Sequence, residues 1–322
     1  MAESTRRTSA PEGGIRSPVW LLLGCTAAGK TDVALALAAQ FELEIVSVDS
    51  MQVYRRMDIG TAKPSREQRA RVPHHLVGVI EPHESFTAAR FVELADAAVA
   101  DIQMRGRTPL LVAGTPFYLM AFLYGMFKGP SADESYRSEV RARAAREGPS
   151  ALYDQLVAID PAAAARIHPN DLHRIERALE VHFQTGRRIS ELQREWEGPP
   201  RYAVRAVGLR RSRDDLAHRI NARVRSMIEA GLVDEVRALL AEPGGLSVQA
   251  RQALGYAQIM DHLEGGASLA DAVETIKIGT RRLAKSQRTW FRRFRQTEWL
   301  DVEPDEAAAS ISQRVAACFA GG

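Results

Sequence analysis

The chain has 322 residues, 45% hydrophobic and 26% charged, and its formal net charge at pH 7 is only +3. This length accommodates about two domains with a sizeable core, and the composition excludes a wholly disordered or strongly polycationic protein. Binding to nucleic acid would therefore need a local basic patch. The longest apolar run, residues 117–127, is shorter than the roughly 20 residues of a membrane-spanning helix, so it predicts a buried helix and no membrane association.

The N-terminus and the cysteines indicate the compartment. Residues 1–16 contain arginines but no apolar segment of a signal sequence, which predicts a disordered leader. Cys25 and Cys318 are the only cysteines, and two such distant thiols make no disulfide framework. Both features favour a protein of the reducing cytoplasm.

The first strong motif follows a short apolar run, Val19–Leu23, which predicts a strand. Residues 24–31 have the spacing G-x-x-x-x-G-K-T, and the alanine- and leucine-rich residues 32–41 predict a helix. A glycine loop between a strand and a helix N-terminus points backbone N–H groups at phosphate oxygens. Lys30 adds a positive charge, and the Thr31 hydroxyl is a candidate Mg²⁺ ligand. The predicted phosphate site comprises Gly24, Thr26, Ala27, Ala28, Gly29, Lys30 and Thr31.

A second buried strand is predicted over Glu44–Val48, and Asp49-Ser50-Met51-Gln52 follows it. Ligands of doubly wound sheets bind beyond the carboxyl ends of the strands, so we expect Asp49 to face the phosphate loop. An aspartate at a strand end is often only a cap, and that alternative stays open. Gly60 and Pro64 indicate that residues 58–64 form a loop.

The next segment contains His74-His75. Adjacent residues of an extended chain point to opposite sides, and no further ligands follow at zinc-site spacing, so a metal site is disfavoured here. Residues 76–80 predict a strand. Residues 85–100 predict a helix, with Ser85 or Thr87 as its cap.

A third strand, Pro109–Ala113, ends in Gly114-Thr115. Nucleotide-hydrolysing proteins with a phosphate loop usually place an acidic Mg²⁺ ligand at the end of such a strand. No acid stands here, which disfavours a motor or switch ATPase. Thr115 instead joins Asp49 as a candidate site residue.

Residues 128–200 change in character to short helices separated by glycine and proline, predicted over 134–146, 151–159, 161–167 and 172–185. An alternating segment, residues 202–209, then predicts a strand that returns to the sheet. We therefore predict an α/β fold, a doubly wound, mostly parallel sheet like that of P-loop NTPases, with a small helical insertion. The core would comprise residues 17–127 and 201–322.

The C-terminal part contains two basic helices. Arg219 and Arg223 lie four residues apart on the helix predicted for 214–229, where both can point at one anion, although an exposed pair remains the alternative. In the last long helix, 268–294, a basic stripe comprises residues 281, 285, 288, 292 and 295. We expect Leu283, Trp290 and Phe294 to form its buried face. Such a stripe without compensating acids favours nucleic acid as the partner.

From about Val19 to Trp299 the chain resembles the tRNA dimethylallyltransferases, also called tRNA isopentenyltransferases. The resemblance rests on seven segments in order: Gly24–Thr31, Ser47–Tyr54, Asp58–Lys63, Pro73–Leu76, Ile167–Asp171, Ala253–Tyr256 and Ala284–Phe291. Some positions depart from the family pattern. Cys25, Ala28, Ala113 and Pro116-Phe117 lie where backbone groups do most of the work, whereas Ala257 and Ser286 replace common basic residues and bear on RNA affinity.

The resemblance implies transfer of a dimethylallyl group from dimethylallyl diphosphate to N6 of the adenosine just 3′ of the anticodon, in tRNAs that read codons beginning with U. It implies Mg²⁺ as cofactor, the anticodon stem-loop as partner, a cytoplasmic monomer, and an insertion that grips the anticodon arm. Asp49 and Thr115 would be catalytic, and Arg219 and Arg223 would join the loop at the diphosphate. The implied tRNA contacts are Asp49, Ser50, Met51, Gln52, Thr115, Arg137, His173, Arg174, Ile175, Glu176, Arg177, Gln252, Ala253, Leu254, Gly255, Tyr256, Lys285 and Arg288.

Three other functions stay open. An adenylate isopentenyltransferase would use the same loop and Asp49 on free AMP or ADP. A small-molecule kinase with a phosphate loop is disfavoured by the missing acid after residue 113. A non-catalytic RNA-binding protein would leave the loop, Asp49 and Thr115 without a role.

Overall fold

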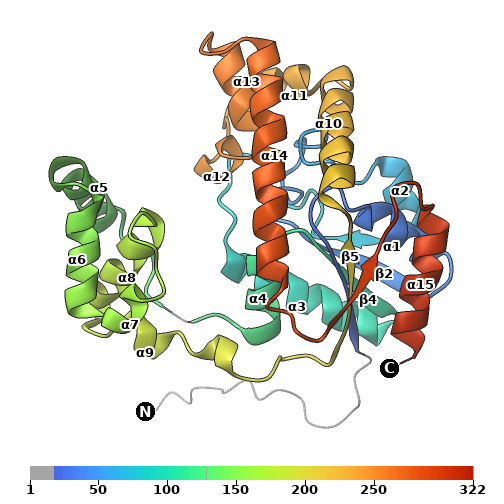
Figure 1. The fold of residues 1–322 in the computed structure, drawn as a ribbon, viewed down its shortest axis with the longest axis horizontal. Helices are drawn as coiled ribbons and strands as arrows, with labels where there is room; N and C mark the ends of the chain where they lie inside the picture. The colour runs from blue at the N-terminus through green and yellow to red at the C-terminus, as the bar shows by residue number, and fades with distance from the viewer. Residues whose placement is uncertain (1–17, 128, 322) are drawn as a thin grey trace, which may run out of the picture. The chain divides into compact units, whose positions relative to one another are not determined.

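The computed structural model describes residues 18–127 and 129–321 (Figure 1), so the predicted leader, 1–16, lies outside the described residues. The chain forms two compact units. Of the described residues, the first unit comprises 18–119 and 202–321, and the second comprises 120–127 and 129–201. Among the described residues, no helix has the length and apolar character needed to cross a membrane.

The first unit is built on a parallel sheet in the order β3-β2-β4-β1-β5-β6. Every residue of β1 and β2 is buried, which explains why both segments are continuously apolar apart from Glu44 and Ser47. The strands are β1 Val19–Leu23, β2 Leu43–Val48, β3 His74–His75, β4 Thr108–Ala113, β5 Val204–Arg210 and β6 Thr297–Asp301.

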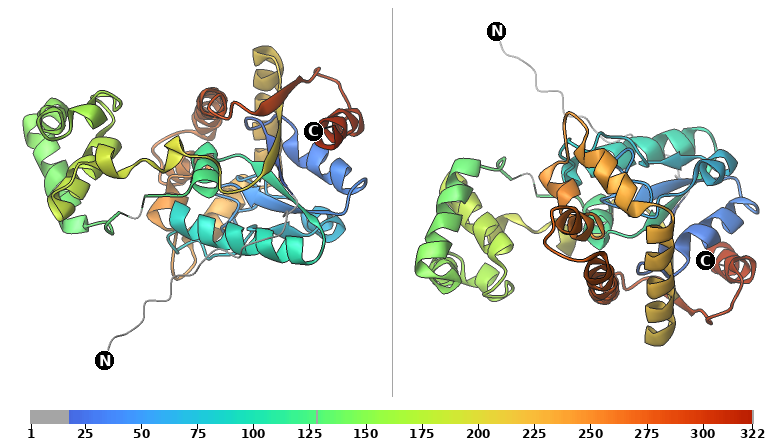
Figure 2. Two further views of the ribbon diagram at one scale, coloured as in Figure 1. Left: turned by 90° about the horizontal axis from the view of Figure 1, so that it is seen from below. Right: turned by 90° about the horizontal axis from the view of Figure 1, so that it is seen from above.

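Helices cover both faces of this sheet, as predicted for a doubly wound fold. Figure 2 shows α1 (Lys30–Ala38) and α15 (Ala308–Ala320) on one face and α3 (Ala88–Met104) on the other. The chain leaves β1 toward β2, whereas it returns from β4 to β5 on the other side of β1. The carboxyl ends of β1 and β4 are therefore the switch point at which such sheets bind ligands.

The other helices of this unit cluster beyond that edge of the sheet. In Figure 1, α10 and α14 lie side by side, and α13 packs on both α14 and α11. Their bounds are α10 Arg213–Glu229, α11 Leu232–Leu240, α12 Val248–Arg251, α13 Tyr256–Leu263 and α14 Leu269–Phe291; the short α2 spans Arg66–Arg71. Helix α4, Pro116–Tyr124, follows β4, and the division between the two units falls within this helix.

The buried face of α14 differs from the predicted one. Leu283 is 42% exposed, so its assignment to the core was wrong, and Trp290 is only half-buried. The buried positions are Ala272, Ile276, Ala284, Gln287 and Phe291, spaced three, four or eight residues apart. A glutamine thus occupies a core position, which a search for apolar residues at helical spacing passes over.

Two shorter predictions also need correction. Residues 76–80 form no strand, because Leu76 has the left-handed φ of 62° and only an isolated bridge joins Tyr54 to Ile80. The strand in this region is β3, whose His75 Nε2 lies 2.6 Å from a carboxylate oxygen of Glu44. Helix α3 begins at residue 88, and its cap is Thr87, whose hydroxyl accepts the N–H of Arg90.

The second unit is a small helical bundle with its own core. Its helices are α5 Glu134–Glu147, α6 Pro149–Ile159, α7 Pro161–Ala164, α8 Leu172–Thr185, α9 Ile189–Leu192 and the short 3₁₀ helix η1 Glu195–Glu197. Leu152 and Leu156 of α6 pack with Ile175 and Leu179 of α8 in that core. Tyr136 and Phe183 stack with their ring centroids 4.4 Å apart.

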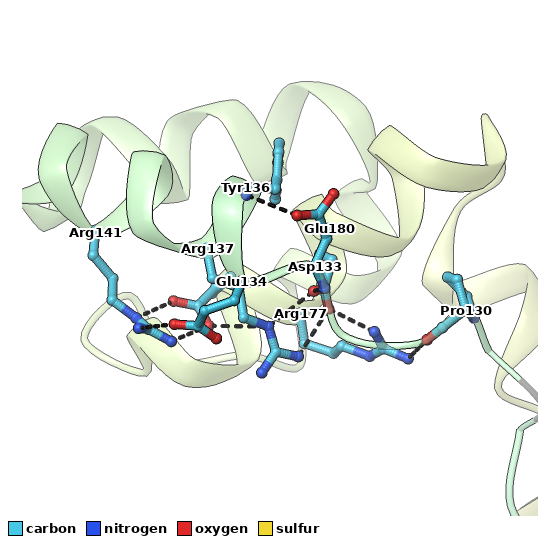
Figure 3. A network of polar contacts seen from close by, with 9 residues as sticks. Pro130, Asp133, Glu134, Tyr136, Arg137, Arg141, Arg177 and Glu180 are labelled. Carbon is cyan, nitrogen blue, oxygen red and sulfur yellow. Dashed lines mark hydrogen bonds and ion pairs between the residues drawn. The ribbon is translucent and has the colours of Figure 1, made fainter.

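An ion-pair network joins α5 to α8 in this unit (Figure 3). Glu180 is fully buried and accepts hydrogen bonds from Arg137 Nε at 2.8 Å, Arg137 Nη2 at 2.9 Å, Arg177 Nη1 at 2.5 Å and the N–H of Asp133 at 2.8 Å. Burial by itself raises the pKa of Glu180, but the hydrogen bonds from Arg137 and Arg177 outweigh it and lower the pKa to about 2. Arg141 pairs with Glu176 beside this group.

We expect Glu180→Gln to destabilise the helical unit by about 3–5 kcal/mol, because the change leaves two arginines without their buried partner. The folded pKa of Glu180 is lowered, so its stabilisation is complete above about pH 5 and is lost as pH falls toward 2. Hydrogen exchange of the α8 amides measures both effects. The matched control is Glu134→Gln, an acid 72% exposed that also pairs with an arginine, for which less than about 1 kcal/mol is expected. Equal losses in the two variants would contradict the assignment.

Candidate active site

A cavity of about 640 Å³ lies within the first unit, at the carboxyl ends of its central strands. Its walls come from the loop after β1, the residues that follow β2 and β4, and helices α10 and α14. Six of the seven residues predicted for the phosphate site line this cavity, and Gly24 does not. The residues after β2 and β4 that line it include Asp49, Ser50, Met51, Gln52 and Thr115. The sheet thus brings together the two groups of residues that the sequence predicted at its edge.

The loop after β1 has the geometry of an anion cradle. Gly29 has a φ of 94°, a conformation that favours glycine, and α1 begins at the next residue. A Cβ at Gly29 would also lie 3.7 Å from a guanidinium nitrogen of Arg219 and 3.8 Å from one of Arg211. The helix N-terminus and the arginines therefore surround the same point of the loop.

Lys30 lies inside this loop. Its Nζ donates to the carbonyl oxygens of Gly24 at 2.7 Å and Cys25 at 3.0 Å. Burial lowers the pKa of Lys30 to about 8, and the nearby guanidinium of Arg223 adds to that effect. The charged form of Lys30 is therefore disfavoured by burial in the free protein, and a bound anion would stabilise it.

Three arginines that follow β5 reach the loop from outside. Arg219 Nε donates to Ala27 O at 2.9 Å, and Arg223 Nη1 donates to Thr26 Oγ1 at 3.3 Å, so both predicted arginines lie against the loop. Burial lowers the pKa of Arg223. Sequence reasoning missed Arg211, which is 5% exposed and donates to Ala28 O at 3.0 Å. Its position directly after a predicted strand was the available signal.

Asp49 performs the capping role that the sequence left open, but with one oxygen only. Its Oδ1 accepts the N–H groups of Met51 at 2.8 Å and Gln52 at 3.1 Å. Among the described residues nothing donates to Oδ2, which lies so close to Gly114 that a Cβ there would come within 2.9 Å of it. Oδ2 therefore remains available to a ligand in the cavity.

Thr115 lies beside Asp49. Its Oγ1 accepts the N–H of Ser50 at 3.0 Å, and its own N–H donates to Val48 O at 2.9 Å. The ends of β2 and β4 are thus tied together, which holds the hydroxyl and the carboxylate at one edge of the cavity.

Gln287 is the second residue that sequence reasoning missed, although it lies within 284–291, the last of the seven segments on which the family resemblance rests. It is 6% exposed on α14. Its Oε1 accepts the N–H of Thr26 at 2.8 Å, and its Nε2 donates to Gly114 O at 2.6 Å. One side chain thereby joins the phosphate loop to the end of β4.

Comparison with known proteins identifies the family. Residues 52–294 match the family model described as IPP transferase, and residues 17–72 match the one described as Isopentenyl transferase. The tRNA dimethylallyltransferase of Anaeromyxobacter dehalogenans is 46% identical over 297 residues, which cover 91% of this chain and 99% of that protein. The chain belongs to the IPP transferase family.

Other relatives of this IPP transferase agree. The tRNA dimethylallyltransferase of Geobacillus thermodenitrificans is 44% identical over 295 residues, which cover 91% of this chain and 93% of that protein. The crystal structure of the tRNA isopentenylpyrophosphate transferase from Bacillus halodurans matches with a TM-score of 0.68 and 40% identity, covering 94% of this chain and 97% of that one. A eukaryotic dimethylallyltransferase captured acting on tRNA matches with a TM-score of 0.78 and 27% identity, covering 93% of this chain and 77% of that one.

The site of this IPP transferase fits a Mg²⁺ ion that takes one ligand from the protein and the others from a bound diphosphate and water. Thr31 lines the cavity, and its hydroxyl makes no hydrogen bond with the described residues. Among all residues that the structure describes, there is no group of three or more His, Cys, Asp and Glu side chains that could hold a metal. A cation here would bind Thr31, diphosphate oxygens and water, which suits the preference of Mg²⁺ for oxygen ligands and retained waters.

The residues implied as tRNA contacts differ in their exposure. His173, Arg174, Gln252 and Lys285 are exposed, and Leu254 and Arg288 are half-buried. Ala253, Gly255 and Tyr256 are buried in the first unit, and Ile175 and Glu176 are buried in the second. The side chains of Ile175 and Tyr256 are 0% exposed and pack in cores, and the place of these two residues among the tRNA contacts stays a prediction.

Two implied RNA-contacting arginines are already engaged. Arg137 and Arg177 bind the carboxylate of Glu180, as Figure 3 shows, so neither is a free surface cation. The insertion therefore uses them to hold its helices together. Arg174 remains exposed and pairs only with Asp171 of its own helix cap.

A second cavity, of about 390 Å³, lies between α10 and α14 of the first unit and is strongly basic. We call it the basic groove; its charged lining residues are Arg213, Asp214, Arg281, Lys285 and Arg288. Arg281 donates to Asn221 Oδ1 at 2.7 Å, whereas the other three cations form no ion pair within the described residues. Three residues of the predicted basic stripe, Arg281, Lys285 and Arg288, thus share this groove with Arg213 of α10.

Proposed function

We propose that this IPP transferase moves the dimethylallyl group of dimethylallyl diphosphate to the exocyclic N6 of the adenosine just 3′ of the anticodon of tRNA, releasing diphosphate. The observation that carries this proposal is that the phosphate loop and the Asp49–Thr115 pair line one cavity. A donor held by its diphosphate in the loop would extend its hydrocarbon toward the carboxylate. The family membership supports the same reaction.

The donor side neutralises the leaving group. The loop N–H groups, Lys30 and the guanidinium groups of Arg219 and Arg223 would bind the diphosphate oxygens, whose negative charge grows as the allylic C–O bond breaks. Mg²⁺, held by Thr31 and the diphosphate, would supply further neutralisation when bound. Both electrons of the C–O bond leave with the diphosphate.

On the acceptor side, Asp49 takes up the proton that the adenine amine releases. The adenine amine is a poor nucleophile because its lone pair is delocalised into the ring, and it is too weak an acid to be deprotonated first. The N6 lone pair therefore forms the new C–N bond as the C–O bond breaks, and Asp49 Oδ2 takes a proton from the nitrogen as it becomes cationic. Thr115 would hydrogen-bond near the same amine and orient it.

Two alternatives lose support. β4 ends at Ala113 without an acidic residue, which disfavours phosphoryl transfer from ATP. The relatives are named for action on tRNA, and nothing among them favours free AMP as the acceptor. With tRNA as the acceptor, we also propose a cytoplasmic, monomeric enzyme.

Mass spectrometry of tRNA nucleosides tests this function. The protein is incubated with tRNA, dimethylallyl diphosphate and Mg²⁺, and N6-dimethylallyladenosine beside the anticodon is the expected product. Parallel reactions replace tRNA by AMP, or the prenyl donor by ATP. Prenylated AMP with unmodified tRNA, or phosphoryl transfer from ATP, would overturn the proposal.

We expect tRNA affinity to fall with salt, because the basic groove would meet RNA phosphates. Arg288→Ala removes one cation of the groove, which lowers the slope of log affinity against log salt by about 1. Filter binding at a series of salt concentrations measures the slope. Arg237→Ala, on α11 and 59% exposed with only a local ion pair, is the control and should leave the slope unchanged. An unchanged slope in Arg288→Ala would exclude the groove from the RNA interface.

A further inference from the structure

Glu235 of α11 accepts four hydrogen bonds from two other parts of the first unit. Its Oε2 accepts the N–H of Asp58 at 2.9 Å and of Ile59 at 2.8 Å, and its Oε1 accepts the N–H of Gly60 at 3.2 Å. Tyr256 Oη donates to Oε1 at 2.5 Å. A carboxylate has about four acceptor positions, so Glu235 has none left for a substrate. Any part it plays in the reaction must be exerted through the loop that it holds.

Tyr256 completes this arrangement from the first turn of α13. Its ring packs so closely on Gly60 that a Cβ there would come within 2.4 Å of a ring carbon. Burial raises the pKa of Tyr256, so the phenol stays protonated and donates to the carboxylate. The loop at residues 58–60 is therefore fixed by hydrogen bonds from its backbone and by a ring against its glycine.

The held loop forms part of the wall of the active-site cavity. Gly60, Thr61 and Ala62 line it, and the last two direct their carbonyl oxygens at Gln52 Nε2, at 3.4 and 3.3 Å. The other end of that amide accepts the hydroxyl of Ser47 at 2.9 Å. The loop thus fixes the orientation of a side chain in the cavity.

Gln52 is in turn bonded to the candidate base. Its backbone N–H donates to Asp49 Oδ1 at 3.1 Å. An unbroken series of contacts therefore runs from Glu235 through residues 58–62 and Gln52 to Asp49. The hydrogen bonds of the phosphate loop come instead from Arg211, Arg219, Arg223 and Gln287. Glu235 is not among these four residues; only Gln287 also reaches the acceptor side, through its hydrogen bond to Gly114 O.

We infer that Glu235 is a positioning residue for the adenine acceptor: it holds the 58–62 loop so that Gln52 and Asp49 are aligned with the N6 amine. This inference rests on the proposed function. It assigns a role to a residue of α11 that makes no contact with the donor site. It also gives a role to the buried hydroxyl of Tyr256, which donates to Glu235.

The test compares Glu235→Gln with wild type. An amide must turn its NH₂ group toward two of the four donors, so part of the loop loses its acceptor. We expect transfer to tRNA (kcat/KM) to fall about 100-fold, since displacement of a reacting group by about 1 Å costs that much. The number of pyrophosphate sites per chain and their affinity, measured by calorimetry, should stay within about twofold of wild type. Amides at residues 58–62 should exchange hydrogen faster.

Two further variants keep the test decisive. Tyr256→Phe removes one of the four hydrogen bonds and keeps the ring on Gly60, so a smaller loss of the same kind is expected. Asp234→Asn makes the same change of charge at the neighbouring position, where the side chain is 80% exposed, and should behave as wild type. If Glu235→Gln loses pyrophosphate sites in proportion to activity, the residue serves stability alone and the inference is wrong.

The remaining outcomes separate the inference from the function beneath it. A fully active Glu235→Gln protein with a loosened loop would overturn the inference and leave the proposed function intact. A wild-type protein that binds pyrophosphate but never prenylates tRNA would overturn the proposed function itself. Slower transfer, unchanged pyrophosphate binding and faster exchange at residues 58–62 together support the inference.

Discussion

Replacement of Asp49 by asparagine should reduce the rate of prenyl transfer about 10³-fold while tRNA still binds. The amide can keep the capping hydrogen bonds from Met51 and Gln52, because its oxygen can take the place of Oδ1. It cannot accept the proton that N6 releases, and general bases contribute about 10²–10⁴-fold to such steps. The variant therefore separates the capping role of the residue from its proposed role as base.

Single-turnover measurements with labelled dimethylallyl diphosphate and saturating tRNA measure this loss. Asp49 is a negative charge close to Lys30 and Arg223. Its removal takes away a charge that repels pyrophosphate, so the affinity for pyrophosphate should not weaken. Asp49→Ala removes the cap as well and should lose at least as much activity. An undiminished rate in the asparagine variant would rule out the base role.

The features that the sequence predicted are local in the chain. The glycine loop, the three strands that precede the site and the polar residues at their ends each depend on a few consecutive residues. A parallel sheet then brings these ends together, because the carboxyl ends of its strands lie at one edge. Asp49 and Thr115 were therefore placed correctly beside the loop without knowledge of any long-range contact.

The features that were missed depend on pairs of residues far apart in sequence. Arg211 reaches Ala28, and Gln287 reaches Thr26, across most of the chain. Polar side chains with such buried partners look the same in sequence as exposed ones. The same limit applies to Arg137, whose pairing with the buried Glu180 was not predicted from the sequence. Exposure and pairing, rather than residue type, decide these roles.

Replacement of Lys30 by methionine should weaken pyrophosphate binding about 10²–10³-fold. The change keeps most of the buried stem and removes the cation, and loss of one partner of a buried, hydrogen-bonded charge pair costs about 2–5 kcal/mol. Isothermal calorimetry with Mg²⁺ and pyrophosphate measures the effect without reference to turnover. Lys277→Met, on α14 and paired only with Glu274, is the control and should bind as wild type. A wild-type affinity in Lys30→Met would remove this residue from the diphosphate site.

The pH dependence of the same binding tests Lys30 independently. Its pKa in the free protein is lowered to about 8, whereas a bound anion favours the ammonium and raises the pKa again. Binding above pH 8 therefore takes up a proton, and the contribution of Lys30 to affinity falls as pH rises, by up to about tenfold per unit. Pyrophosphate gains negative charge over the same range, so the ratio of wild-type to Lys30→Met affinity isolates the lysine. That ratio should be constant below about pH 7 and shrink toward pH 9. A ratio independent of pH would mean that the ammonium is not desolvated in the free loop.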